Sequence, residues 1–233
     1  MLEHEKQVQL ELASHIGRLL REAFGKGPQS IHVSIRRPFV VVYLRSFLSQ
    51  TEKILLEQDQ VFSMQNTRDL VMKTLIPEIK AFTSLIAGMH LRQFYYDWGL
   101  HNHSGVFVGI EADEGNLEAI KREHYPGKDE FLQEIRSISE MVQKVPEESY
   151  SCMVNDRTLV VVRNGILINI EKELIRLGYE ENLKLAKRNL EKRHLHNNNH
   201  FQRILHRHIV DVFADWDFHY DRSVFVFMLQ PGQ

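Results

Sequence analysis

The chain lacks features that several common classes of protein require. Its 233 residues include a single cysteine, Cys152, so no internal disulfide can form, which is typical of proteins in a reducing compartment. No apolar run approaches the roughly 20 residues needed to cross a bilayer. The first residues also lack the basic-then-apolar order of a secretory signal. We therefore expect a cytoplasmic protein without a transmembrane segment, which reaches the inner face of a membrane, if at all, through a partner.

An excess of charge of either sign is also missing. The 29 Lys and Arg residues oppose 31 Asp and Glu residues, giving a formal net charge of −2. No long-range field would therefore hold nucleic acid or an anionic membrane, and nucleic acid is not an expected partner. Hydrophobic residues make up 43% of the chain, which is typical of a globular protein and too high for a disordered one.

Recognisable catalytic motifs are absent as well. The sequence contains no Walker loop, no His-Glu-x-x-His and no Gly-x-Ser-x-Gly. Gly25-Lys26-Gly27 begins like a dinucleotide fingerprint, but it follows a predicted helix, and Ser30 stands where the third glycine belongs. Cys152 lies in an apolar, strand-like stretch and is expected in the core. We therefore predict a protein that is not an enzyme and has no cofactor or metal.

An internal repeat is the strongest positive signal. Asp97-Trp98-x-x-His101, followed by Val106-Phe107-Val108, recurs 118 positions later as Asp215-Trp216-x-x-His219, followed by Val224-Phe225-Val226. Upstream matches follow in the same order at offsets of 118 to 120, and they pair Val40-Val41-Val42 with Val160-Val161-Val162, Glu52-Lys53 with Glu171-Lys172, and Pro28 with Pro146. Two tandem modules are therefore predicted, over residues 1–111 and 112–233.

Each module shows the pattern helix, strand, strand, helix, strand, strand. In the first module one helix face carries Val8, Leu12, Ile16, Leu19 and Ala23. A helix with one apolar stripe is stable when that stripe packs against the apolar face of a sheet. Each module is therefore predicted to be a two-layer α+β sandwich with a mainly antiparallel sheet. Duplication further suggests that the modules pack as a pseudo-dimer.

Proline and glycine mark the expected ends of the elements. The first helix should stop near Gly25, and Gly88 should cap the second helix of that module. Pro77 lies inside this second helix and should kink or break it. Residues 113–128, which contain Pro126 and Gly127, are predicted to be a linker or the frayed start of the second module.

The first module also resembles a known family. The run from Gly25 to Val33, followed by Val40-Val41-Val42, Leu48-Ser49, Glu52-Lys53, Gly88 and Asp97, is similar to the MpsC or YbcI-like family of small bacterial proteins. The second module resembles it weakly, because it keeps only Pro146 of the Gly-x-Gly-Pro turn and has His206 where Gly88 stands.

This resemblance implies a role but no functional residue. The family is associated with a membrane system that translocates cations or takes up inorganic carbon, and its members are the soluble component. A non-enzymatic accessory or regulatory subunit that docks on a membrane transport complex is therefore expected. Whether the chain also forms homo-oligomers stays open.

The duplicated Asp-Trp-x-x-His element supplies the first candidate site. Asp97 and His101, with Asp215 and His219, could hold a ligand or shuttle a proton at a turn. In the alternative interpretation, which we favour, each Asp bonds turn amides, each Trp fills the edge of the core, and each His lies on the following loop.

A basic stretch over residues 184–208 supplies the second candidate. It includes Lys187, Arg188, Lys192 and Arg193, which could contact phosphates or acidic lipid headgroups. A solvated helix face is the commoner meaning of such a run, and no aromatic residues interleave it. A nucleic-acid-binding or regulatory protein that uses this stretch is the alternative function.

Histidine enrichment in the same region allows a third hypothesis, a metal-dependent enzyme. Five histidines lie between His194 and His208, and His196 and His200 have the four-residue spacing that lets two imidazoles of a helix reach one metal. However, the run Asn197-Asn198-Asn199 discourages an ordered helical turn, and a third ligand would have to come from Asp211 or further away. Local enrichment alone does not make a zinc site.

Overall fold

The computed structural model describes residues 2–111, 117–196 and 198–231, and the fold is α+β. As predicted, it contains two similar α-β-β-α-β-β modules, each with a four-stranded antiparallel sheet. Contacts divide the chain into two compact units that do not quite follow the modules. The first unit is Met1–Phe94 with Trp98–Ala112, and the second is Tyr95–Asp97 with Asp113–Gln233.

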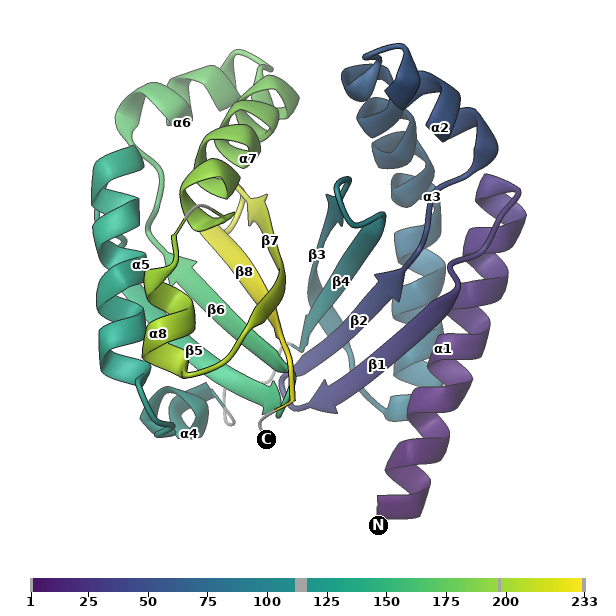
Figure 1. The fold of residues 1–233 in the computed structure, drawn as a ribbon, viewed down its shortest axis with the longest axis horizontal. Coiled ribbons are helices and arrows are strands. Elements are labelled where there is room, and N and C mark those ends of the chain that lie inside the picture. The colour runs from purple at the N-terminus through teal and green to yellow at the C-terminus, as the bar shows by residue number, and fades with distance from the viewer. Residues whose placement is uncertain (1, 112–116, 197, 232–233) are drawn as a thin grey trace. The chain divides into compact units, whose positions relative to one another are not determined.

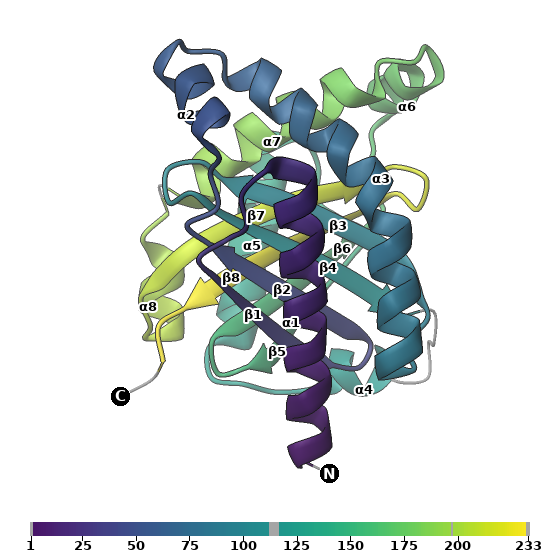
Figure 2. The same ribbon diagram turned by 90° about the vertical axis from the view of Figure 1, so that its right-hand side faces the viewer.

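The first module consists of two long helices on one face of a sheet, with a short helix between them (Figures 1 and 2). Its elements are α1 (Leu2–Phe24), β1 (Ser30–Arg36), β2 (Phe39–Arg45), α2 (Gln50–Glu57), α3 (Val61–Ala87), β3 (Leu91–Gly99) and β4 (Ser104–Glu111). The strand order is β1-β2-β4-β3. Strands β1 and β2 form a hairpin and pair antiparallel throughout.

The second module repeats this arrangement, with one additional short helix at its start and a divided long helix. Its elements are α4 (Leu117–Arg122), α5 (Lys128–Val142), β5 (Glu148–Asn155), β6 (Thr158–Asn164), α6 (Asn169–Arg176), α7 (Glu180–His196), α8 (His200–Leu205), β7 (Ile209–Asp217) and β8 (Arg222–Leu229). The strand order is β5-β6-β8-β7, the counterpart of the first sheet. Residues 113–128 are not simply a linker, because α4 forms there and buries Ile120, whereas 112–116 lie outside the described residues.

The apolar stripes of the long helices are buried in the modules, including the stripe predicted for the first helix. In α1, Leu12 and Ile16 are buried as expected, whereas Ala23 is exposed and Leu20 is buried. In α5 the buried stripe comprises Phe131, Ile135 and Ile138, which belong to the hydrophobic core of the second unit. These apolar contacts supply the main stabilisation of each module.

The long helix α3 is continuous through Pro77, so of the two predicted outcomes, a kink or a break, the break does not occur. Pro77 is exposed, and α3 buries Met72, Leu75 and Ile79 on either side of it, so packing offsets the hydrogen bond that the proline cannot make. Gly88 caps α3 in the left-handed conformation and donates its N–H to the Ser84 carbonyl, as predicted. His196, at the position equivalent to Pro77 with an offset of 119, is instead the last residue of α7.

Left-handed backbone positions show that the two modules share their turns as well as their elements. Four positive-φ residues of the first module recur at offsets of 118 or 119, in the pairs Ser46 and Gly165, Asp59 and Gly178, Gly88 and His206, and His103 and Asp221. Three of these pairs have glycine in one module and a larger residue in the other. The repeat therefore retains the turn geometry more closely than the residue at these positions.

A buried ion pair joins the short helix to the long helix in each module. In the first, Arg68 on α3 donates to the Glu52 carboxylate on α2, with 2.6 Å between Nε and Oε1, and Glu52 also accepts the Ser49 N–H. In the second, Lys187 on α7 lies 2.9 Å from Glu171 on α6. The two pairs are equivalent at an offset of 119, and all four residues are buried.

Acid should weaken the first of these pairs. Burial disfavours the charged Glu52 carboxylate, but the hydrogen bond and positive charge of Arg68 outweigh this effect and hold its pKa below the ordinary value of 4.5. A carboxyl with a lowered pKa stabilises the fold above its unfolded pKa, and this stabilisation is lost as the pH falls through the folded pKa. We expect Glu52→Gln to be less stable than wild type at neutral pH but to lose less stability on acidification below 4.5. Urea unfolding across this range tests the effect, and parallel curves for the two proteins would contradict it.

The core of the second module contains a polar network that the first module lacks at the equivalent positions. Arg163 on β6 is buried, and it donates to the hydroxyls of Ser139 and Ser223 at 2.8 Å each and to Glu191 at 2.5 Å. At an offset of 119, the positions of Ser139, Arg163 and Glu191 are occupied in the first module by three buried apolar side chains, Leu20, Leu44 and Met72.

The first module thereby supplies the substitutions that test this network. Removing one partner of a buried ion pair leaves an uncompensated charge, so Arg163→Leu alone should cost about 3–5 kcal/mol of unfolding free energy. The double variant R163L/E191M carries the residues of the first module and should recover most of that loss, because apolar residues often replace buried ion pairs at little cost. Urea unfolding measures both values, and a double variant as unstable as the sum of the single variants would refute the interpretation.

Candidate functional site

A cluster of buried charges lies in the second unit between α7 and strand residues. Lys184, Arg188 and Lys192 follow one another at four-residue steps on α7 and therefore share one helix face. This face meets two carboxylates, Asp215 on β7 and Asp97 in the segment Tyr95–Asp97 that belongs to the same unit. We call these five residues the charge cluster.

Arg188 lies between the two carboxylates and interacts with both. Its Nε is 3.4 Å from Asp97 Oδ1, and its Nη2 is 3.7 Å from Asp215 Oδ1. The lysines each take one carboxylate, with 2.7 Å between Lys184 Nζ and Asp215 Oδ1 and 2.6 Å between Lys192 Nζ and Asp97 Oδ2. Because both carboxylates are at most 3% exposed, these ion pairs are only weakly screened by solvent.

Reciprocal backbone hydrogen bonds fix the carboxylates. Asp97 Oδ2 accepts the N–H of Ala214 at 2.9 Å, and Asp215 Oδ2 accepts the N–H of Tyr96 at 2.8 Å. Ala214 directly precedes Asp215, and Tyr96 directly precedes Asp97. The two hydrogen bonds are therefore equivalent in the repeat, whose offset here is 118. The duplicated aspartates therefore hold strand segments together, and three cations opposite two carboxylates leave the cluster with one excess positive charge.

The predicted turn role of Asp97 and Asp215 is wrong in both interpretations, because both residues lie within strands. Asp217 instead accepts the N–H groups of the next turn, from His219 at 3.1 Å and from Tyr220 at 3.3 Å. His219 is exposed and packs edge-on against the Tyr220 ring.

The remaining parts of the duplicated element lie where the favoured interpretation expected them. Trp98 and Trp216 are buried, and His101 is exposed in the turn after β3.

The interpretation of Lys187, Arg188 and Lys192 as a solvated helix face is also wrong. Lys187 and Arg188 are 5% and 3% exposed, and the Lys192 side chain is 15% exposed. These three side chains form ion pairs with buried carboxylates. They are therefore not exposed to contact the phosphates of a nucleic acid. Arg193 is exposed, and its role as an interaction residue stays a prediction.

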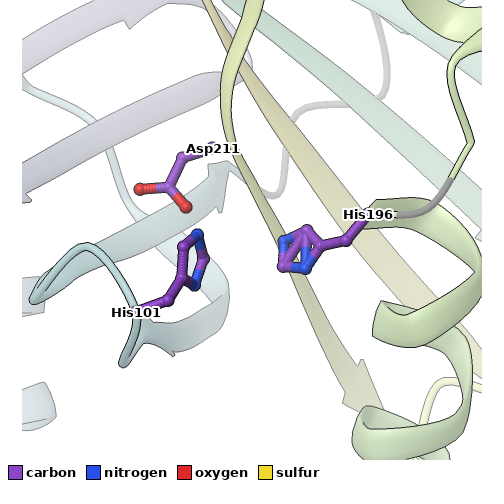
Figure 3. Close-up of side chains that lie close together, drawn as sticks. All are labelled: His101, His196 and Asp211. Atoms are coloured by element: carbon purple, nitrogen blue, oxygen red, sulfur yellow. The ribbon is translucent and has the colours of Figure 1, made fainter.

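The histidine-rich stretch is divided between two helices. α7 ends at His196 and α8 begins at His200, so the helical spacing proposed for a shared metal does not exist. His200 Nδ1 lies 3.6 Å from Glu134 on α5. His196 instead faces Asp211, with an imidazole nitrogen and a carboxylate oxygen within 4.8 Å of each other (Figure 3). The third side chain drawn there, His101, belongs to the first unit.

Sequence reasoning did not single out Lys184 as a site residue, and although it named Asp97 and Asp215 as candidates, it did not pair them with the α7 cations. The four-residue period of Lys184, Arg188 and Lys192 was a usable signal, because it places three cations on one face. Their carboxylate partners carry no such signal, because Asp97 lies 87 to 95 positions before them in the sequence.

Comparison with known proteins shows the family of the chain. The family model described as Na+-translocating membrane potential-generating system (MpsC) matches residues 4–112 and again residues 128–231. No curated protein and no solved structure shows a significant match to the chain. None of the described helices is both long enough and apolar enough to cross a bilayer.

The charge cluster predicts a large effect for a small substitution. Asp215→Asn keeps a side-chain oxygen for the Tyr96 N–H but leaves Lys184 and part of the Arg188 charge without a counter-ion, so it should cost about 3–5 kcal/mol of unfolding free energy. Asp156→Asn, the same change at an exposed turn, should cost less than about 0.5 kcal/mol. Chemical denaturation followed by tryptophan fluorescence compares them, and equal stabilities for the two variants would show that the cluster contributes nothing.

Proposed function

Because the chain belongs to the MpsC family, we propose that it is a non-enzymatic accessory or regulatory subunit that docks on a membrane complex that translocates cations. The family's description supplies the association with a Na+-translocating, membrane-potential-generating system. The docking role, a position at the cytoplasmic face of the membrane and the absence of catalytic activity are parts of the proposal. The chain would then act by binding, through a surface suited to a protein partner.

Exposed apolar side chains at one corner of the first module carry this proposal. Ile54 on α2 is 56% exposed, and Phe62 in the first turn of α3 is 53% exposed. Val61 beside it is 37% exposed. Large apolar side chains gathered on a surface typically mark protein contacts, and aromatic residues are enriched in the cores of such contacts.

The second module exposes apolar side chains at its equivalent corner. Ile170 in the first turn of α6, Leu177 at its end and Tyr179 just before α7 are each more than half exposed. The residues differ from those of the first module, but the place in the fold is the same. Two related corners could therefore contact two similar parts of a membrane complex.

Affinity capture from detergent-solubilised membranes of the source bacterium tests the proposal. The wild-type chain should recover an integral membrane transport subunit, identified by mass spectrometry. The variant I54S/F62S should recover at least about tenfold less if these side chains are hot spots of the contact, since truncating a hot-spot side chain costs about 2 kcal/mol or more. The matched control is Leu85→Ser, which removes a 79% exposed apolar side chain at the other end of α3.

Stability measurements separate loss of docking from loss of folding. All three substituted residues are exposed, so the unfolding free energies should stay within about 0.5 kcal/mol of wild type. Failure of the wild-type chain to recover any membrane transport subunit would count against the proposed role. Equal recovery by wild type and I54S/F62S would place the contact elsewhere on the chain.

A further inference from the structure

A groove of about 620 Å³ lies on the second unit, and residues of α5, α7 and the start of α8 line it. Its apolar part includes Met141 and Leu190, which are 70% and 39% exposed. Its polar part includes Arg193 and His194 from α7 and Arg203 from α8. Concave sites of this volume commonly hold small molecules.

The groove depends on the interruption between α7 and α8. Asn198, Asn199 and His200 line it, and these residues occupy the corner at which the long helix is divided. Asn198 Oδ1 accepts the His200 N–H at 2.8 Å, which orders the start of α8. The equivalent long helix of the first module, α3, continues through the corresponding positions, so this corner is particular to the second module.

Positive charge dominates the groove. Arg193 and Arg203 are exposed, and neither has a carboxylate partner among the residues that the structure describes. Arg193 donates to the Asn189 carbonyl at 3.4 Å and keeps its other N–H groups available. Glu134, which also lines the groove, already accepts a hydrogen bond from Asn198 and lies 3.6 Å from His200 Nδ1. The lining therefore offers two guanidinium groups to an anion.

We propose that this groove binds a phosphate-bearing molecule, with Arg193 and Arg203 holding the phosphate and with Met141 and Leu190 contacting its carbon portion. Guanidinium groups present paired N–H donors that match phosphate oxygens in geometry and charge. His194 can add a donor, and more strongly when it is protonated. A soluble organic phosphate and the phosphate headgroup of a lipid share this chemistry. The site is independent of the apolar corners proposed for docking.

The test uses the full chain and two probes that separate these sources. Phenyl phosphate represents a soluble ligand with an apolar portion, and its binding is measured by calorimetry. Phosphatidylcholine vesicles with and without phosphatidic acid represent the headgroup source, and binding is measured by co-sedimentation. Either probe should bind saturably, and raising the salt concentration should weaken the binding. Arg193→Gln and Arg203→Gln should each weaken it by about tenfold or more, since hydrogen bonds to charged groups have this magnitude.

Arg136→Gln is the matched control. It removes the same charge from an exposed position on α5 that is not part of the groove lining, and it should leave the affinity unchanged. If only phenyl phosphate binds, the ligand is a soluble phosphate. If only the vesicles with phosphatidic acid bind, the ligand is a lipid headgroup. Each of these results supports the proposal. Absence of saturable binding to both probes, or binding that R193Q and R203Q leave unchanged, overturns it. Membrane-subunit capture by R193Q/R203Q should equal that of wild type, so failure here does not affect the docking proposal.

Discussion

A carboxylate buried at the first turn of a short helix is costly unless its charge is compensated, and both modules compensate it with a cation from the following long helix. Glu52 is held by Arg68, and Glu171 is held by Lys187, so each short helix is fixed to the long helix that follows it. Because these pairs are buried, losing either partner would leave an uncompensated charge. The corners proposed for docking are built by the same helix pairs. The internal salt links therefore determine where the exposed apolar side chains are presented.

The second module has diverged by acquiring charge inside its core. Where the first module buries Leu44 and Met72, the second buries Arg163 and Glu191. The α7 cations of the charge cluster add further buried ion pairs. Buried ion pairs contribute little net stability compared with apolar packing, but they specify geometry, because each charge must find its partner. We infer that ion pairs replaced apolar packing in the second module and that they fix the position of α7. This helix also lines the basic groove.

Much of the fold follows from patterns that are local in the sequence. The stripe Leu12 and Ile16 predicts the buried face of α1, and the duplicated tryptophan element predicts the repeat, because both depend on spacing alone. The role of Asp97 was not predictable in this way, since its hydrogen-bond donor Ala214 is 117 positions away. Pro77 does not break α3, because packing of the buried residues Met72 and Ile79 on either side of it offsets the hydrogen bond that proline cannot make. Local sequence patterns thus predict helices and strands, whereas ion pairs between residues far apart in the sequence can be identified only from the three-dimensional structure.

The most direct test of this account is a double-mutant cycle on each of the two equivalent ion pairs. Glu52→Gln with Arg68→Met, and Glu171→Gln with Lys187→Met, are measured singly and together by urea unfolding. The account predicts a favourable coupling of at least about 1 kcal/mol in both modules, since contacting partners in one network are not additive. Single variants whose effects add within about 0.5 kcal/mol in either module would contradict it, because that pair would then not be holding its helices together.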